Sequence, residues 1–232
     1  WADIEALDGQ VAESVQIDAL LKIWDLQRNL TRWVLSHHGS ALDIARLVDR
    51  YGPGMAALKA ALPQVLVAHS RADYEVDVEK WQGLEVPAAL AEQLAKVAEL
   101  GAAFDIVEVA LAGDYPIERV AATYFDLGHH LDIGGLRRQI EALPVESRWH
   151  AQARGALRDE LAAQHCALVR QVLAGAPAGD PHPAARWIER DDPTLKFTLG
   201  MLEEIRSQPV DYPIASVALR RFAQLVQAGA KG

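Results

Sequence analysis

Histidine is the residue type with the most evident capacity for chemistry here, because the chain contains eight histidines, four of them in adjacent pairs. The pairs are His37-His38 and His129-His130. A helical zinc site uses two histidines four residues apart, which places both on one face. Adjacent residues on a helix point about 100° apart, so neither pair predicts a metal site. Both pairs fall near predicted helix C-termini, where the helix dipole favours positive charge, and this indicates helix-end or surface residues.

Three further groups have side chains suited to catalysis. His165 and Cys166 form a single soft pair, and Glu160 lies five residues before His165, which does not match the E-x-x-H spacing of di-iron bundles. An acidic cluster, Glu189, Asp191 and Asp192, has the oxygen ligands of a magnesium site. Asp192 precedes a proline, however, which is typical of a helix N-cap. We predict no catalytic residue and no metal site.

Nucleotide binding is also not predicted. The sequence lacks both G-x-G-x-x-G and G-x-x-x-x-G-K-[ST], whose glycines let the backbone approach phosphate groups. It also lacks the alternation of strands and helices that builds a dinucleotide-binding sheet. We therefore expect no NAD or other cofactor to bind within this chain. A Ser–His–Asp triad remains open from the sequence, although no nucleophile-elbow motif supports one.

Arginine and tryptophan are enriched at protein interfaces, and they form two groups on predicted long helices. The alternative interpretation, surface guanidinium groups together with a core indole ring, fits the same residues. Trp33, near the end of its helix, suits either role. The candidate interface residues are Arg28, Arg32, Trp33, Arg154 and Arg158.

The composition of the chain indicates which classes of partner and which cellular location to expect. The 232 residues carry a formal net charge of −9, which disfavours binding to phosphate backbones or anionic lipid surfaces. No apolar run approaches the ~20 residues of a membrane span. Cys166 is the single cysteine, so an intramolecular disulfide is impossible. We expect no nucleic-acid partner, no membrane partner and a cytoplasmic location.

The elements that must position these residues are predicted to be helices. Apolar residues recur at helical spacing in about nine or ten segments, so the predicted fold is all-α, an orthogonal or bundle-like array. Two segments are long, about 12–36 and 147–174. Residues 73–79 alternate as a strand would, but no second strand is available and we predict a helix. Other predicted helices span 42–51, 53–62, 87–111 and 135–143, with an irregular linker over 175–183.

Several short motifs resemble, in order along nearly the whole chain, the C-terminal helical region of the large bacterial NAD-dependent glutamate dehydrogenases. Each motif is short, and their order makes the resemblance specific. The motifs are Ile4-Glu5-Ala6-Leu7-Asp8-Gly9, Thr31-Arg32-Trp33-Val34-Leu35, Phe104-Asp105-Ile106-Val107-Glu108-Val109-Ala110, Tyr124-Phe125, Leu143-Pro144, Arg148-Trp149, Ala156-Leu157-Arg158-Asp159-Glu160-Leu161 and Ser216-Val217-Ala218-Leu219-Arg220.

The resemblance implies a parent enzyme that converts L-glutamate to 2-oxoglutarate and ammonia with NAD. It implies partners in the catalytic region of the same chain and in a homo-oligomer, a tetramer. The chain begins at Trp1 without Met, so we expect residues 1–232 to be one C-terminal domain, or two sub-bundles over about 1–113 and 114–232. A stand-alone interaction module and a small metal-dependent or acid–base enzyme are the alternatives.

Overall fold

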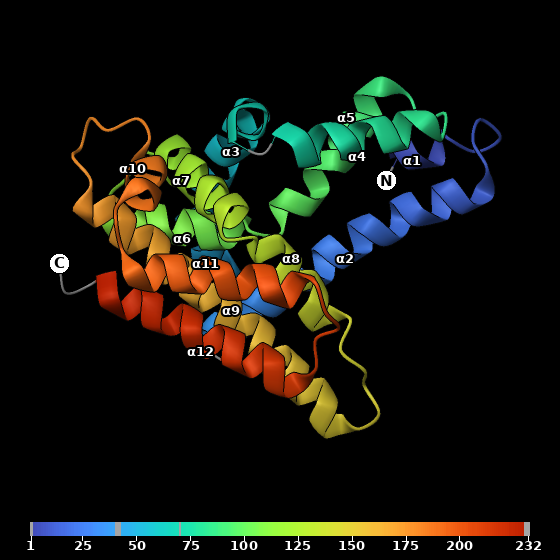
Figure 1. Ribbon diagram of the computed structural model, residues 1–232. Helices are drawn as coiled ribbons and strands as arrows, with labels where there is room; N and C mark the ends of the chain where they lie inside the picture. The colour runs from blue at the N-terminus through green and yellow to red at the C-terminus, as the bar shows by residue number, and fades with distance from the viewer. Residues whose placement is uncertain (1, 40–42, 70, 230–232) are drawn as a thin grey trace. The chain divides into compact units, whose positions relative to one another are not determined.

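A computed structural model describes residues 2–39, 43–69 and 71–229, and these residues form twelve helices and no strand, which confirms the all-α prediction (Figure 1). Within these ranges no helix is both long and apolar enough to span a membrane. The helices are α1 (Ala2–Glu5), α2 (Glu13–His38), α3 (Ile44–His69), α4 (Arg71–Gly83), α5 (Ala88–Leu100), α6 (Ala103–Gly113), α7 (Ile117–His130), α8 (Ile133–Glu141), α9 (Arg148–Gly175), α10 (Pro183–Glu189), α11 (Pro193–Arg206) and α12 (Tyr212–Gly229).

The best-patterned segments were predicted correctly. The two segments expected to be long are α2 and α9, each within two residues of the expected ends. The alternating residues 73–79 lie inside α4, so the helix prediction is confirmed there. Lys22 of α2 reaches Asp77 of α4 at 2.7 Å, and Trp81 one turn further along is buried. These contacts favour the helix over the strand that the alternation alone suggests.

The prediction of two helices over 42–51 and 53–62 was wrong, because α3 continues through Gly52-Pro53-Gly54 and also contains Pro63 (Leu42 lies outside the described residues). A proline inside a helix removes one hydrogen bond and commonly ends the helix. Tertiary packing outweighs that tendency here. A Cβ on Gly54 would lie 2.6 Å from Cγ1 of Val107, so α3 passes close to α6 at this glycine.

Two other differences raise the number of helices from the expected nine or ten to twelve among the described residues. The segment expected as one helix over 87–111 is divided into α5 and α6 by a turn at Gly101. The helices α1 and α10 have only four and seven residues, which is too short for a clear apolar period. Proline at the first position of α10 marks its start, and this Pro183 is the last residue of the expected linker over 175–183.

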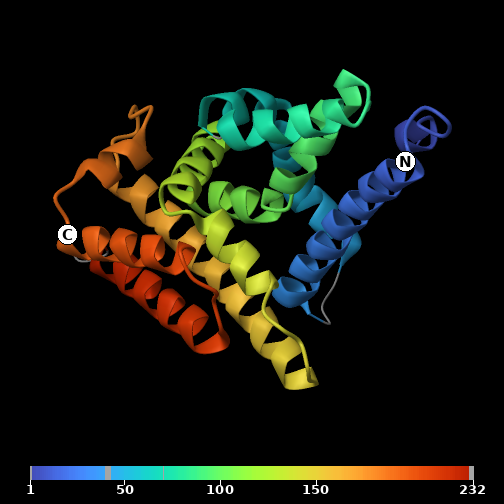
Figure 2. The same cartoon turned by 45° about the vertical axis from the view of Figure 1, so that its right-hand side comes forward.

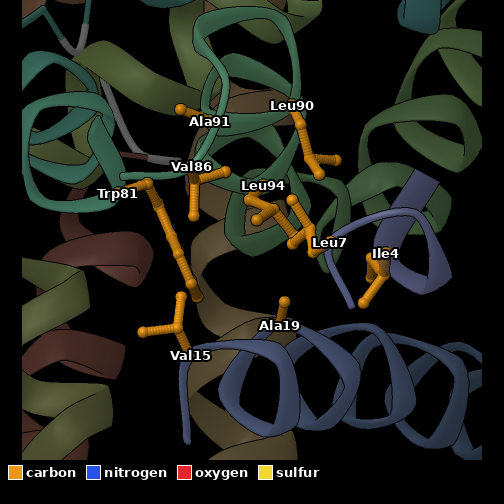
Figure 3. Close-up of a cluster of buried hydrophobic side chains, with 9 residues drawn as sticks. All are labelled: Ile4, Leu7, Val15, Ala19, Trp81, Val86, Leu90, Ala91 and Leu94. Atoms are coloured by element: carbon orange, nitrogen blue, oxygen red, sulfur yellow. The ribbon is translucent and has the colours of Figure 1, made fainter. Parts of the chain in front are cut away.

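The chain divides into two compact units, Trp1–Leu111 and Ala112–Gly232. In the first unit, α1, α2, α4 and α5 surround an apolar core that Figure 3 shows in close-up. Although α2 has 26 residues, it contributes only two buried side chains to this core, Val15 and Ala19. The buried core residues are Ile4, Leu7, Val15, Ala19, Trp81, Val86, Leu90, Ala91 and Leu94.

The second unit is built around α9, which contacts α7, α8, α10 and α12. The helices α9 and α12 lie side by side in both views (Figures 1 and 2). Four apolar residues that recur at helical spacing along α9 are all buried: Leu157, Leu161, Leu168 and Val172. The apolar face of α9 therefore forms the centre of this unit.

Candidate functional site

A cluster of aromatic and ionisable side chains surrounds Trp33, near the C-terminal end of α2. The indole ring lies between the rings of His37 and Phe104, stacked on both, with centroid distances of 4.0 and 4.7 Å. Tyr51 of α3 meets the indole edge-on at 5.7 Å. We call Trp33, His37, Tyr51, Phe104, Asp105 and Glu108 the Trp33 cluster. Stacked and edge-on pairs of this kind add stability beyond area burial alone.

The polar atoms of the Trp33 cluster are paired with two carboxylates of α6. The indole Nε1 of Trp33 donates a hydrogen bond to Oδ1 of Asp105 at 2.6 Å. The Tyr51 hydroxyl donates to Oε2 of Glu108 at 2.7 Å, and an amino group of Arg50 lies 3.2 Å from the same carboxylate. Asp105 and Glu108 are three residues apart, so both project from one face of α6.

The hydrogen bonds of the Trp33 cluster hold its side chains in place. Burial, and then the hydrogen bond to Glu108, raise the pKa of Tyr51 above its ordinary value, so the hydroxyl stays protonated. Each carboxylate accepts a hydrogen bond from a ring group. The indole of Trp33 has no proton to give up near neutral pH. The Trp33 cluster therefore joins α2, α3 and α6 through ring stacking and hydrogen bonds.

We expect Tyr51→Phe to lower the free energy of unfolding of the first unit by about 1.5 kcal/mol, because it removes a hydrogen bond to a charged group and little volume. Urea unfolding followed by circular dichroism measures the change. Arg50→Gln is the matched control, since the side chain of Arg50 is 53% exposed and contacts the same carboxylate. A control loss as large as that of Tyr51→Phe would contradict this account.

His165 is the most deeply buried ionisable side chain described in the second unit, with 1% of its surface exposed. Its Nε2 lies 3.1 Å from the carbonyl oxygen of Tyr124, and its ring packs on the Tyr124 ring at 3.9 Å. Burial, and then the nearby Arg137, lower the pKa of His165 to about 3. The imidazole is therefore neutral at physiological pH and acts as a core residue.

Comparison with known proteins identifies the family of this chain. The sequence model described as "Glutamate dehydrogenase, C-terminal" matches residues 1–224. The chain belongs to this family. The resemblance noted from the short motifs is thereby confirmed, and the structure above is that of a glutamate dehydrogenase C-terminal domain.

Relatives of this domain are much longer proteins. The chain is 33% identical over 236 residues to the NAD-specific glutamate dehydrogenase of Pseudomonas aeruginosa. It is 27% identical over 234 residues to that of Halomonas elongata. In both comparisons the match covers 100% of this chain and 14% of the relative. The chain is 26% identical over 204 residues to the NAD-specific glutamate dehydrogenase of Mycobacterium tuberculosis. That match covers 87% of this chain and 13% of the relative.

The structure of this glutamate dehydrogenase C-terminal domain places the five candidate interface residues on two helices. On α2, Arg28 is exposed and Arg32 is half-buried, while Trp33 is held in the Trp33 cluster. On α9, a guanidinium nitrogen of Arg154 donates to the carbonyl oxygens of Glu141 and Leu143, at 3.1 and 3.4 Å. Arg154 thus satisfies carbonyls at the end of α8. Arg158, 22% exposed, lies 3.5 Å from Asp159.

Two members of the acidic cluster of the domain, Asp191 and Asp192, have structural partners. Asp192 caps α11, accepting hydrogen bonds from the backbone N–H groups of Thr194 and Leu195 at 2.8 and 3.2 Å, which confirms the N-cap prediction. Asp191 pairs with Lys196 at the surface. Across the described ranges, no group of three or more His, Cys, Asp or Glu side chains converges as metal ligands would.

We expect Asp192→Ala to lower the free energy of unfolding of the second unit by about 1 kcal/mol, the usual cost of losing an N-cap. Two backbone N–H groups at the start of α11 would lose their acceptor. Thermal unfolding followed by circular dichroism measures the change. Asp191→Ala is the control, because the Asp191 side chain is 88% exposed and its pairing with Lys196 is a surface ion pair. Equal shifts in melting temperature would refute the capping role.

Sequence reasoning weighed Trp33 and His37 and missed the other four members of the Trp33 cluster: Tyr51, Phe104, Asp105 and Glu108. The available signal was in α6, where five of eleven residues are buried apolar side chains and two carboxylates interrupt the apolar sequence. Carboxylates in such a helix need partners, because burying an unpaired charge is costly. The partners are more than 50 residues away in the chain. Periodicity within one helix gives no information about them.

Proposed function

We propose that this chain is the non-catalytic C-terminal helical domain of an NAD-dependent glutamate dehydrogenase. The observation that carries the proposal is the family match over residues 1–224, together with relatives of which the chain represents 14%. In the proposal, the parent enzyme converts L-glutamate, NAD and water to 2-oxoglutarate, ammonia and NADH. The catalytic groups and the NAD site belong to the remainder of the polypeptide.

The side chains of the domain support a structural role. The carboxylates of Asp105 and Glu108 accept hydrogen bonds from Trp33 and Tyr51, and Asp192 caps a helix. These are groups that an acid–base enzyme would need to leave available to substrate. The domain packs against the catalytic region of the same polypeptide and supports assembly of a homo-oligomer, a tetramer, in the cytoplasm.

The first test is an activity assay of the purified chain. With L-glutamate and NAD present, the chain alone is expected to form no NADH above the rate of the buffer. The absorbance of NADH measures turnover directly. NADH formation by the chain alone, dependent on glutamate, would refute the non-catalytic role.

The second test is complementation. The parent dehydrogenase truncated before this domain is expected to have little activity, and adding the chain in trans is expected to restore part of it. An unrelated helical protein of similar size serves as the control. Failure of the chain to bind the truncated enzyme would favour the alternative of a stand-alone interaction module.

A further inference from the structure

The helix α2 carries apolar side chains on two opposite faces. Val15 and Ala19 are buried in the core of the first unit. Residues two positions apart on a helix point about 200° apart, so Ile17 and Leu21 lie on the opposite side. Both are exposed, at 47% and 49%. A helix at the surface of a domain normally carries polar residues on its outer face.

Two more large apolar side chains lie on this outer face further along the helix, with Arg28 and Thr31 between them. Trp24 is 55% exposed and Leu35 is 52% exposed, and both lie within about 20° of the direction of Ile17. We call Ile17, Leu21, Trp24, Arg28 and Leu35 the outer stripe of α2. Single exposed apolar residues are ordinary on a protein surface, whereas aligned large ones mark a contact surface.

Arg28 makes the outer stripe better suited to bind a partner. Its guanidinium carbon lies 5.7 Å from the centroid of the Trp24 ring, in a cation–π arrangement. A carboxylate oxygen of Asp25 lies 2.8 Å from a nitrogen of the same guanidinium. The two contacts restrain the Trp24 and Arg28 side chains, which reduces the entropy lost when a partner binds. Tryptophan and arginine are the residue types that most often dominate binding energy at interfaces.

The size of the outer stripe indicates what kind of partner covers it. From Ile17 to Leu35 a helix rises about 27 Å, and one face about 10 Å wide presents roughly 300 Å². A stable complex of two free proteins buries about 800 Å² on each partner. The outer stripe is too small to hold a second free copy by itself. It is large enough for a contact within one polypeptide, where the linkage provides a high effective concentration.

We infer that the outer stripe of α2 docks on the remainder of the dehydrogenase polypeptide. The inference rests on the proposed function, and the relatives supply the occupant, because 86% of the length of the first two has no counterpart in this chain (100 − 14 = 86). The occupant is an apolar surface with a hydrogen-bond acceptor or carboxylate placed to receive Arg28.

Thiol labelling tests the contact. In a Cys166→Ala background, Leu21→Cys places one thiol on the outer stripe, and Gln93→Cys places one on the exposed surface of α5 as the control. In the chain alone, both thiols are expected to react with a maleimide at similar rates. When the truncated dehydrogenase is added, labelling at position 21 is expected to slow by about tenfold or more, since the thiol reacts only when the contact opens. Labelling at position 93 is expected to stay unchanged.

A second measurement uses affinity. Trp24→Ser is expected to weaken binding to the truncated dehydrogenase by about 30-fold, the effect of removing an interface hot spot. Val48→Ser is the matched control, because Val48 is an apolar residue of the same unit that is 62% exposed and lies on α3. Equal weakening by both variants would overturn the assignment to α2, and circular dichroism checks that each variant is folded.

The outcomes separate the two proposals. If a complex forms but position 21 stays as reactive as before, the inference is wrong and the proposed function stands. If position 21 is already protected in the chain alone, another surface of this chain covers the outer stripe, and the inference is wrong. If the wild-type chain forms no complex with the truncated dehydrogenase, the proposed function fails and the inference fails with it.

Discussion

Trp33→Ala is expected to lower the free energy of unfolding of the first unit by about 3 kcal/mol, at the lower end of the range for truncating a packed aromatic side chain. The variant loses the stacking on His37 and Phe104 and the edge contact with Tyr51. It also leaves Asp105 without the indole donor at 2.6 Å. Three helices meet at this ring, so the effect extends over α2, α3 and α6.

Arg32→Ala is the matched comparison, because Arg32 precedes Trp33 in the same helix. Truncating a half-buried arginine is expected to cost less than truncating a tryptophan that stacks between other rings. Trp33→Phe separates ring packing from the hydrogen bond, and its loss is expected to fall between the other two. Urea unfolding followed by circular dichroism measures all three variants. Equal stabilities of the alanine variants would contradict the packing role and indicate that Trp33 is an exposed interface residue.

Acidification is expected to destabilise the second unit through His165. In the unfolded chain the imidazole has its ordinary pKa of 6.5, whereas burial lowers the pKa to about 3 in the folded unit. Between these values the unfolded state binds more protons, so stability falls as the pH drops below 6.5. The linkage relation gives a loss of about 2 kcal/mol between pH 7.5 and pH 5 from this residue.

His165→Leu isolates the effect. The variant removes the titrating group and keeps an apolar side chain in the core, so its loss of stability between pH 7.5 and pH 5 is expected to be about 2 kcal/mol smaller than that of the wild-type chain. The difference in slope is the readout, whatever the stability of the variant at neutral pH. His130→Leu, at an exposed helix end, is the control and is expected to keep the wild-type slope. A wild-type slope in His165→Leu would refute the assignment.

The parts of the fold that the sequence predicts well are those with strong local signals. The α9 face has a clear helical period, and Asp192 before Pro193 marks the start of α11. These signals act over one or two helical turns. The helix through Pro53 was not predictable in this way, because the packing of α3 against α6 outweighs the local preference.

The candidate site was less accessible to prediction than the fold. Trp33 was identified as a core or interface residue, but the carboxylate of Asp105 lies 72 positions away in the chain. Such pairs depend on how helices cross, which a period within one helix does not encode. Arg154 was identified as an interface candidate because of its residue type. Its contacts with the carbonyls at the end of α8 exist only in the folded unit.

The crossing of α3 and α6 also constrains how this family diverges. A side chain at position 54 would occupy space that a methyl group of Val107 fills, 2.6 Å from the position of the added carbon. Replacement of Gly54 is therefore conditional on a smaller residue at position 107, whereas a smaller residue at position 107 does not depend on a change at position 54. We expect homologues that replace Gly54 to carry a smaller residue at position 107. The tolerated order of substitution is a smaller residue at position 107 first and a side chain at position 54 second. The pair is an epistatic unit that links two helices more than 50 positions apart.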